Sequence, residues 1–546
     1  MQDYEASVSF LGTWGPFQRR VFFLLCVTCI PCGYNILSVI FLLASPPHHC
    51  HIPTHSNLSQ QWIQASIPVQ VVSGQPKRSS CSRYDLDLLQ NLSALGLRPS
   101  QGLIQNQSAL KQEGCKDGWT YSTEYYKHTV VTEFNLVCSD QWKQPLTSLA
   151  YFLGGVCGCF FSGLISDRFG RKPVLFGTIA LLSIFSSAVA LAPSWPVFIV
   201  LFFMLGLGQI SCYVAMFVLG SEILIGSSRV LFSSLGLPIA YGLGMMMLPC
   251  TAYLVSSWRQ LALIMAMPGL ACFPLWCLIP ESPRWLVSRG RVQEADHLLR
   301  SAALENLVDA PPVIFPSVEQ SESHEVESFG FLDLLRTTNI RSITLKLWLI
   351  WFSISISYYG VSFNLSSVSG SPFLNYFLLA AVELPASIAS WLAARSLPRT
   401  ATCLFHNVPL LTSPLLPADH PDSTLFLVLL GKFGVMAGNG VLYIYTGELS
   451  PTGIRTTAMS SCVMFSRVGS SLSPYLLQLD VFYPFLPWTI VGCLSLLSVL
   501  FSIFLPETFR KPLPDTIYQM PPTQQYVYTL LVQEQAAFAW AWSDES

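Results

Sequence analysis

Long apolar runs alternate with short polar segments along most of the chain. A helix needs about 20 mostly apolar residues to cross a bilayer. The sequence predicts twelve transmembrane helices at 21–44, 145–165, 173–192, 196–219, 231–254, 260–280, 345–363, 372–394, 401–418, 423–446, 457–478 and 484–505. The pattern is that of an all-α membrane protein with two six-helix halves, 21–280 and 345–505, joined by a polar linker, 281–344.

The composition agrees with a membrane protein and excludes a soluble one. Of 546 residues, 51% are hydrophobic and only 11% are charged, with a mean hydropathy of +0.48, whereas soluble domains carry about 25% charged residues. Most of the 29 lysines and arginines fall in segments on one side of the predicted bundle. Basic loops face the cytoplasm, so we expect the N-terminus (1–20), the linker and the tail (506–546) to be cytoplasmic.

The first two helices are separated by a long loop, 45–144, which we expect to be extracellular. An even set of cysteines in an oxidising compartment predicts two disulfides, whose pairing the sequence leaves open: Cys50, Cys81, Cys115 and Cys138. Three glycosylation sequons begin at Asn57, Asn91 and Asn106. The sequence therefore predicts that this loop is an extracellular domain with two disulfides and N-linked glycans.

Charged residues of the first half recur in the second half, each 226 residues further along the chain. Glu222 precedes Arg229 by seven residues, and Glu448 precedes Arg455 by the same spacing. The segment PESPR (280–284) returns as PETFR (506–510), again 226 residues later. Two halves related by repetition are typical of secondary transporters, whose substrate site lies near mid-membrane between the repeats. The repeat therefore predicts pseudo-symmetric halves.

The segment GLISDRFGRKPVL (163–175) gathers alternating charges into a tight turn at a membrane face. One interpretation is a solvated loop that anchors the helix ends. The other is a conformational latch that holds the cytoplasmic side shut until substrate shifts the balance. The predicted gating residues are Asp167, Arg168, Arg171, Glu222, Arg229, Glu448 and Arg455.

Arg467 stands alone in the segment SSCVMFSRVGSSLSPYLL (460–477). A guanidinium within a span faces a cavity or a partner because burial without either is expensive. One interpretation is an ion pair with Glu383. The other is a counter-charge for a substrate carboxylate, which the guanidinium fork binds with two parallel hydrogen bonds.

An onium group requires aromatic faces or a carboxylate. The predicted aromatic residues of the substrate site are Tyr241, Trp351, Tyr358, Tyr359 and Tyr443. Each of them, taken alone, is equally compatible with core packing. Lys432 in GKFGV is either a second counter-charge or a structural pair.

The segment GLISDRFGRKPVL resembles the signature loop of the major facilitator superfamily. PESPRWLVSRGRVQEA resembles its sugar and organic-ion transporters, and GWTYS, VTEFNLVC, GKFGV and SRVGS resemble the organic cation/carnitine (OCTN) branch. The resemblance implies a plasma-membrane transporter of carnitine-like zwitterions and organic cations, secondary-active or facilitative, working by alternating access. It implies the arginine of SRVGS as the carboxylate site, sodium as a coupling ion, and no other cofactor.

Several segments depart from that resemblance. Cys32 and Cys212 stand where the branch has asparagines, and a thiol is a poor ligand for a hard cation, so we expect sodium dependence to be lost or weakened. Ile225 and Gly226 break a nucleotide-motif-like stretch, which argues against ATP binding there. The run 401–418 and the tail 518–546 are atypical.

Three alternatives to the carnitine-like reading remain open. They are a polyspecific organic anion or drug carrier, a transport-defective variant of the same fold, and a non-transporting membrane protein. We do not expect an enzyme, because the cysteines and histidines form no nucleophile triad or metal-ligand cluster. The expected partners are a small organic cation or zwitterion and the lipid bilayer. Nucleic acid is not expected, because the chain has no basic patch.

Overall fold

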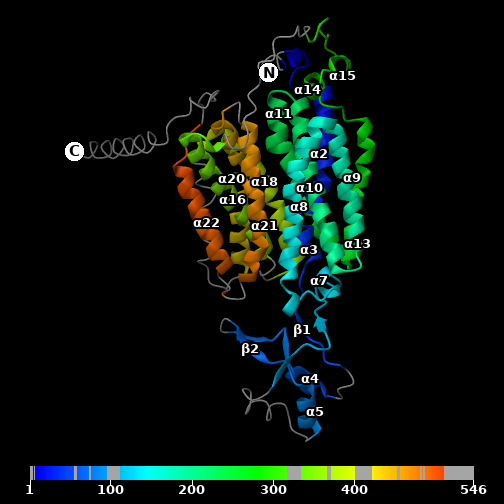
Figure 1. Cartoon of the computed structure of the whole chain (residues 1–546), viewed down its shortest axis with the longest axis vertical. Coiled ribbons are helices and arrows are strands. Elements are labelled where there is room, and N and C mark those ends of the chain that lie inside the picture. The colour runs from blue at the N-terminus through cyan, green and yellow to red at the C-terminus, as the bar shows by residue number, and fades with distance from the viewer. Residues whose placement is uncertain are drawn as a thin grey trace, which may run out of the picture.

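The computed structural model describes residues 4, 7–53, 58–72, 75–94, 111–315, 334–365, 370–399, 421–451, 455–479, 483 and 486–508. Two helical bundles stand side by side, and a small domain projects from one end of the first (Figure 1). We call that end the loop-domain face. The opposite end, where the first part of the linker (residues 283–315) lies, is called the linker face.

The first half is a bundle of long apolar helices. Its elements are α2 (Pro16–Ile36), α3 (Ser38–Leu42), α8 (Lys143–Phe169), α9 (Arg171–Val189), α10 (Trp195–Ile223), α11 (Ser227–Leu231), a π-helical turn (Phe232–Gly236), α12 (Leu237–Leu254), α13 (Trp258–Ala271) and a 3-10 turn (Phe273–Cys277). Glycines bring α8 and α10 into backbone contact: a Cβ at Gly154 would overlap the carbonyl of Phe203, and one at Gly206 that of Tyr151. Small residues permit this close approach in membrane bundles.

The second half repeats this architecture. Its described helices are α16 (Thr338–Asn364), α17 (Pro372–Ala381), α18 (Glu383–Ser396), α20 (Pro421–Leu449), α21 (Arg455–Gln478) and α22 (Leu486–Ile503). In Figure 1 they form the yellow-to-orange bundle beside the cyan and green one.

The all-α membrane prediction is confirmed. Ten helices in the described part of the chain are long and apolar enough to cross a membrane. The 24-residue α21 is not among them, because its serines and Arg467 lower its hydropathy. The predicted span 401–418 and the tail 518–546 lie outside the described residues, so the count of twelve stays a prediction.

The loop domain is built from short paired strands and helices. Antiparallel pairs join β1 (His48–Cys50) to β6 (Trp119–Tyr121), β2 (Val69–Val72) to β3 (Gln75–Arg78), and β4 (Ser82–Tyr84) to β5 (Gln112–Gly114). The helices are α4 (Gln60–Ala65), α5 (Leu86–Ala94) and α7 (Val130–Glu133), followed by a 3-10 turn (Cys138–Asp140). Trp62, Tyr84 and Leu89 form its small core. Of the three sequons, Asn91 is exposed on α5, and Asn57 and Asn106 lie outside the described residues.

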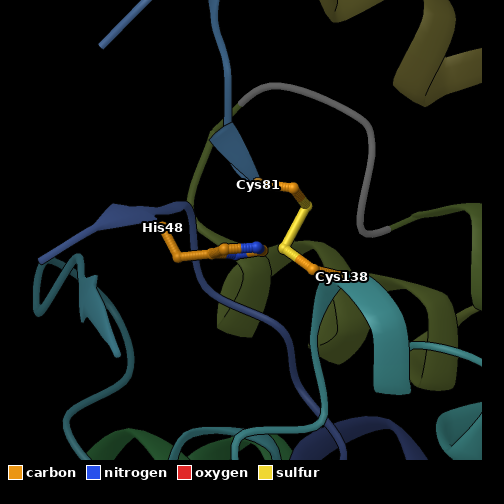
Figure 2. Close-up of side chains that lie close together, drawn as sticks. All are labelled: His48, Cys81 and Cys138. Atoms are coloured by element: carbon orange, nitrogen blue, oxygen red, sulfur yellow. A yellow bond between two sulfur atoms is a disulfide. The ribbon is translucent and has the colours of Figure 1, made fainter. Parts of the chain in front are cut away.

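The four loop cysteines pair as Cys50 with Cys115 and Cys81 with Cys138, so both predicted disulfides are present. His48 lies beside the second bridge (Figure 2), with a ring nitrogen within 4.8 Å of both sulfurs. The two sulfurs are bonded to each other, and no thiolate is left to bind a metal ion. The Cys81–Cys138 disulfide therefore links the loop domain to the segment that leads into the helical bundle.

The linker begins with two helices, α14 (Pro283–Ser288) and α15 (Val292–Asn306), which dock on the first half. Asn306 donates to Leu11 O and to Gln18 Oε1, at 3.0 and 2.8 Å. Glu305 pairs with Arg20 at 2.6 Å. Helix α15 thus lies on the linker face, next to the short N-terminal 3-10 helix (Ser9–Leu11).

The halves touch at the loop-domain face through aromatic rings. Phe373 of α17 packs against Phe41, Tyr126 and Tyr253, with ring centroids 6.0, 5.4 and 5.7 Å apart. Gln478 donates to Gln141 O across the same seam at 3.5 Å.

At the linker face the two halves line a cavity of about 400 Å³ between them. Its lining residues are Trp14, Ser227, Ser228, Val230 and Leu231 from the first half and Trp391 and Arg395 from the second. The molecule is therefore closed at the loop-domain face and open at the linker face.

Candidate substrate site and gates

Arg467 lies at the seam between the halves, where α21 packs against α8 and α16. Its nearest electrostatic partners are Tyr359, Cys159, Tyr443 and Tyr241, and the phenol of Tyr359 is within hydrogen-bonding reach. The Arg467 Nε is buried without a hydrogen-bond partner among the described residues. A buried donor left unpaired is costly, so this guanidinium is poised to bind an acceptor.

Tyrosines from both halves surround the guanidinium. Tyr241 on α12 accepts a hydrogen bond from Gln209 at 3.4 Å and meets Tyr213 edge-on at 5.5 Å. Tyr358 and Tyr359 on α16 meet each other edge-on at 4.9 Å. Phenols supply hydrogen-bond donors for a carboxylate and ring faces for an onium group.

Trp351 has a supporting position. It is only 2% exposed, its indole N–H donates to Thr446, and its ring meets Tyr443 edge-on at 4.5 Å. Trp351 contacts Tyr443, which lies near Arg467, and holds that phenol in place. The structure thus brings Arg467, Tyr359, Tyr241 and Tyr443 together and keeps Trp351 one layer away.

Of the two interpretations of Arg467, the ion pair with Glu383 does not form in the structure. Glu383 on α18 pairs with Lys432 on α20 at 3.3 Å, and both side chains are at most 1% exposed. The Lys432 ammonium also lies 3.0 Å from the ring centroid of Tyr358. Tyr358 donates to Glu383 at 2.5 Å. Lys432 therefore has partners inside the second half, and its ammonium covers the face of Tyr358.

The predicted latch forms a charge cluster on the linker face of the first half. Arg171 pairs with Glu222 at 3.0 Å and with Asp167 at 2.6 Å. Glu281 accepts backbone hydrogen bonds from Arg171 and Lys172 at the start of α9. A carboxylate there is favoured by the positive end of the helix. Arg168 forms no ion pair within the described part of the chain and lies over the ring of Phe169.

The second half repeats the cluster with other members. Arg399 pairs with Glu448 at 2.9 Å, and Glu507 accepts from the Arg399 backbone N–H. Ser282 donates to Glu222 in the first half as Thr508 donates to Glu448 in the second. The partner of Glu448 is therefore Arg399, where the sequence suggested Arg455 for the latch.

Arg229 and Arg455 occupy matching positions. Each donates from Nε to the carbonyl five residues earlier, to Leu224 at 3.0 Å and to Ser450 at 3.2 Å. The ion pairs of Arg171 and Arg399 each join residues of a single half. They brace the helix ends while the linker face is open.

The helical halves and their repeated clusters match a known family. The sequence pattern of the family described as "Sugar (and other) transporter" covers residues 102–517. The chain belongs to that transporter family. It is therefore a multi-pass membrane transporter with the major facilitator fold, and the prediction that it is not an enzyme is confirmed by this membership.

The transporter has close relatives. Organic cation/carnitine transporter 2 of Homo sapiens is 45% identical over 95% of this chain and 94% of that protein. Solute carrier family 22 member 4 of Mus musculus is 43% identical, covering 95% of each. The resemblance to the organic cation/carnitine branch is thus confirmed.

Among solved structures, the major facilitator proton:xylose symporter XylE bound to 6-bromo-6-deoxy-D-glucose aligns with a TM-score of 0.58 at 15% identity. The alignment covers 92% of this chain and 99% of that one. At this identity the likeness shows the fold alone.

Sequence reasoning missed several residues of the site and gates. Tyr213 and Cys159 both lie near Arg467, and they carry no motif that marks them. Arg399 escaped the repeat search because it follows Arg171 by 228 residues, two more than the other matched pairs. Arg399 matches Arg171 once a loop difference of two residues between the halves is allowed.

Proposed function

We propose that this transporter carries carnitine-like zwitterions and organic cations across the plasma membrane by alternating access. Relatives named organic cation/carnitine transporter or solute carrier family 22 member 4, at 43% to 45% identity over nearly the whole chain, support the substrate class. The observation that carries the proposal is Arg467, with an unpaired buried Nε among phenols from both halves.

The chemistry of the centre suits a zwitterion. The guanidinium fork of Arg467 binds the carboxylate, and the hydroxyls of Tyr359 and Tyr443 complete its hydrogen bonds. The ring faces of Tyr241 and Tyr213 then receive the onium group. Because these residues come from both halves, a bound substrate stabilises the closed intermediate between the two open states.

The loop domain is assigned to the extracellular side and both termini to the cytoplasm. Two disulfides form and persist in an oxidising compartment, and Asn91 offers an exposed sequon on the same domain. With this orientation the cavity at the linker face opens to the cytoplasm. The structure then corresponds to an inward-facing state.

Sodium is proposed to be dispensable. The thiols of Cys32 and Cys212 face each other across α2 and α10, within hydrogen-bonding reach and fully buried. Thiols are weak ligands for a hard cation. Asn35 is the nearby amide, and its Nδ2 donates to Pro31 and Met265 carbonyls, while its Oδ1 has no partner among the described residues. One free oxygen is too few for a sodium cage.

The first test is uptake of labelled carnitine into cells, with sodium present or replaced by a bulky organic cation, corrected for surface protein. We expect saturable uptake that is indifferent to sodium. Arg467→Gln should lower uptake efficiency by about tenfold or more, as loss of a charged bidentate contact does. The matched control is Arg291→Gln, because Arg291 lies on the exposed linker, where it pairs with Glu294 and lies over the ring of Trp285.

The results separate the alternatives. Undiminished uptake by the Arg467 variant would refute the carboxylate assignment. A transporter that accepts simple monocarboxylates as well as carnitine is a polyspecific anion carrier, a reading that the positive charge of Arg467 also favours. Surface protein without any uptake indicates a transport-defective chain.

A further inference from the structure

Two histidines of the loop domain stand on the same face of one strand. His49 of β1 lies directly opposite Thr120 of β6, and opposed residues of a ladder share a face. His51 follows two residues later, and its Nδ1 lies 3.1 Å from Thr120 Oγ1. Because alternate residues of a strand point the same way, both imidazoles stand on the face that carries Thr120.

The neighbouring His48 points to the other face. Its ring meets that of Tyr121, the residue opposite it, with centroids 5.7 Å apart. The same ring lies beside the Cys81–Cys138 disulfide (Figure 2). His48 therefore belongs to the base of the loop domain, and the other two histidines form a separate pair.

The backbone that carries the pair is held firmly. Cys50, between the two histidines, is 0% exposed and bonded to Cys115. The backbone N–H of His51 donates to Gly118 O at 2.9 Å, and its carbonyl accepts from Arg83 Nη1 at 2.8 Å. Since rigid elements keep ligand side chains in place, little ordering is needed when these rings bind a common ion.

Both rings have nitrogens available for a ligand. The two side chains are exposed, and the ring of His49 makes no hydrogen bond within the described part of the chain. His51 uses its Nδ1 on the Thr120 hydroxyl, which leaves its Nε2. A histidine that binds a metal through one ring nitrogen commonly donates the other N–H to an oxygen, and that bond fixes the ring.

The surroundings keep His49 in the form that binds metals. Partial burial, and next the positive charge of Arg78, lower the pKa of His49 from its ordinary value of 6.5. The ring is therefore neutral at neutral pH, and a neutral imidazole is the ligand that metals require. Arg78 also repels a cation bound there, so its charge weakens the affinity and offers a way to test it.

We propose that His49 and His51 bind a divalent transition-metal ion, zinc or copper, on the loop domain, with water completing its coordination. Imidazole suits Zn²⁺ and Cu²⁺, whereas Ca²⁺ prefers oxygen ligands. The site lies outside the substrate centre and is independent of the proposed function. It revises the expectation that the histidines form no metal-ligand cluster, because only the strand register places the two rings on one face.

Zinc titration of the full-length protein tests the site. Tag-free protein with intact disulfides and alkylated free thiols competes for Zn²⁺ with a chromophoric indicator at neutral pH. We expect one zinc ion per chain, displaced by Cu²⁺, which binds nitrogen ligands more tightly, and unaffected by Ca²⁺. His49→Gln and His51→Gln should each weaken binding at least about tenfold, since even an outer partner of a ligand contributes that much.

Three other variants examine the surroundings of the pair. Thr120→Val, which removes the oxygen that fixes His51, should weaken zinc binding about tenfold. Arg78→Gln should strengthen it about twofold to fourfold, the effect of a unit charge ~10 Å from a divalent ion in water. His128→Gln is the matched control, because His128 is exposed on the same domain but lies outside this strand, and it should bind zinc like the wild type.

A second measurement needs no variant. Zinc should protect His49 and His51 of the wild type from acylation by diethyl pyrocarbonate, read by mass spectrometry, while His128 stays reactive. The inference is overturned if the wild type binds no zinc, if binding survives in both histidine variants, or if His128→Gln weakens it equally. If a variant fails to fold, protection decides alone, and equal acylation with and without zinc overturns the inference.

Discussion

Phe373 holds the loop-domain face shut, and its removal should open that face. Its ring meets Phe41, Tyr126 and Tyr253, all from the first half and its loop domain, and Phe373 itself is 9% exposed. These contacts cross the seam, so they are broken when the halves separate there. Packing of Phe373 against its own half is present in both states and cancels.

The magnitude follows from the ring pairs. Each aromatic pair contributes about 0.5–1.5 kcal/mol beyond simple burial, so three pairs give about 1.5–4.5 kcal/mol in favour of the closed face. A tenfold change in an equilibrium takes about 1.4 kcal/mol. Phe373→Ala should therefore increase the population open at this face at least about tenfold.

Cys159 provides the assay, because it lies beside Arg467 in the centre. In the proposed orientation, a membrane-impermeant thiol reagent applied to intact cells reaches Cys159 through the loop-domain face, and the four loop cysteines are protected in disulfides. We expect the labelling rate of the Cys159 peptide to rise about tenfold in Phe373→Ala. Cys159→Ser should remove the signal.

Leu374→Ala is the matched control, since the neighbouring Leu374 is 56% exposed on the outside of the same helix. The variant removes apolar side-chain volume from α17 without changing a residue of the seam. Equal labelling rates in the two variants would refute the gate and the energy assigned to it.

Two further predictions concern the charged ends of the helices. Arg171→Gln should reduce carnitine turnover about tenfold, because the partly buried carboxylate of Glu222 loses its partner. The control is Arg168→Gln, since Arg168 is exposed, and its turnover should stay close to wild type. An equal loss in both variants would contradict the role of the cluster. Hydrogen bonding, first from Arg259, lowers the pKa of Glu133 from its ordinary value of 4.5. The pair therefore stabilises the folded loop domain above that value and loses this effect as the pH falls through the lowered pKa. The melting temperature of purified Arg259→Gln should lie below wild type at neutral pH and approach it below about pH 4.5, and a gap independent of pH would refute the linkage.

The helical architecture was open to prediction because its signal is local. Apolar runs of bilayer length and positive charges at one set of ends need no knowledge of packing. The 226-residue repeat of Glu222, Glu281 and their counterparts was equally readable, since it needs only register along the chain. Arg467 also followed from sequence, because a charge in a span is rare enough to stand out.

The partners of these charges could not be read from spacing. Whether Glu383 meets Arg467 or Lys432 depends on the rotation of α18 against α20 and α21, and the apolar pattern of a membrane helix constrains rotation weakly because lipid and protein interior are both apolar. The same limit applies to Tyr213 and Trp351. Their residue type suggests an aromatic lining, but only the packed helices decide which ring faces the centre.

The two faces of the transporter are held together by different interactions, aromatic packing at one and ion pairs within each half at the other, and this bears on how it cycles. At the loop-domain face the halves adhere through aromatic packing around Phe373, which is insensitive to salt. At the linker face Arg171 and Arg399 instead pair with carboxylates within their own halves while the cavity is open. Closing the linker face must therefore exchange bonds inside each half for bonds between halves, with little net gain. The closed aromatic seam then decides the resting state, and at the proposed site a substrate that bridges Arg467 and the phenols of the first half would supply the energy that moves the molecule out of it.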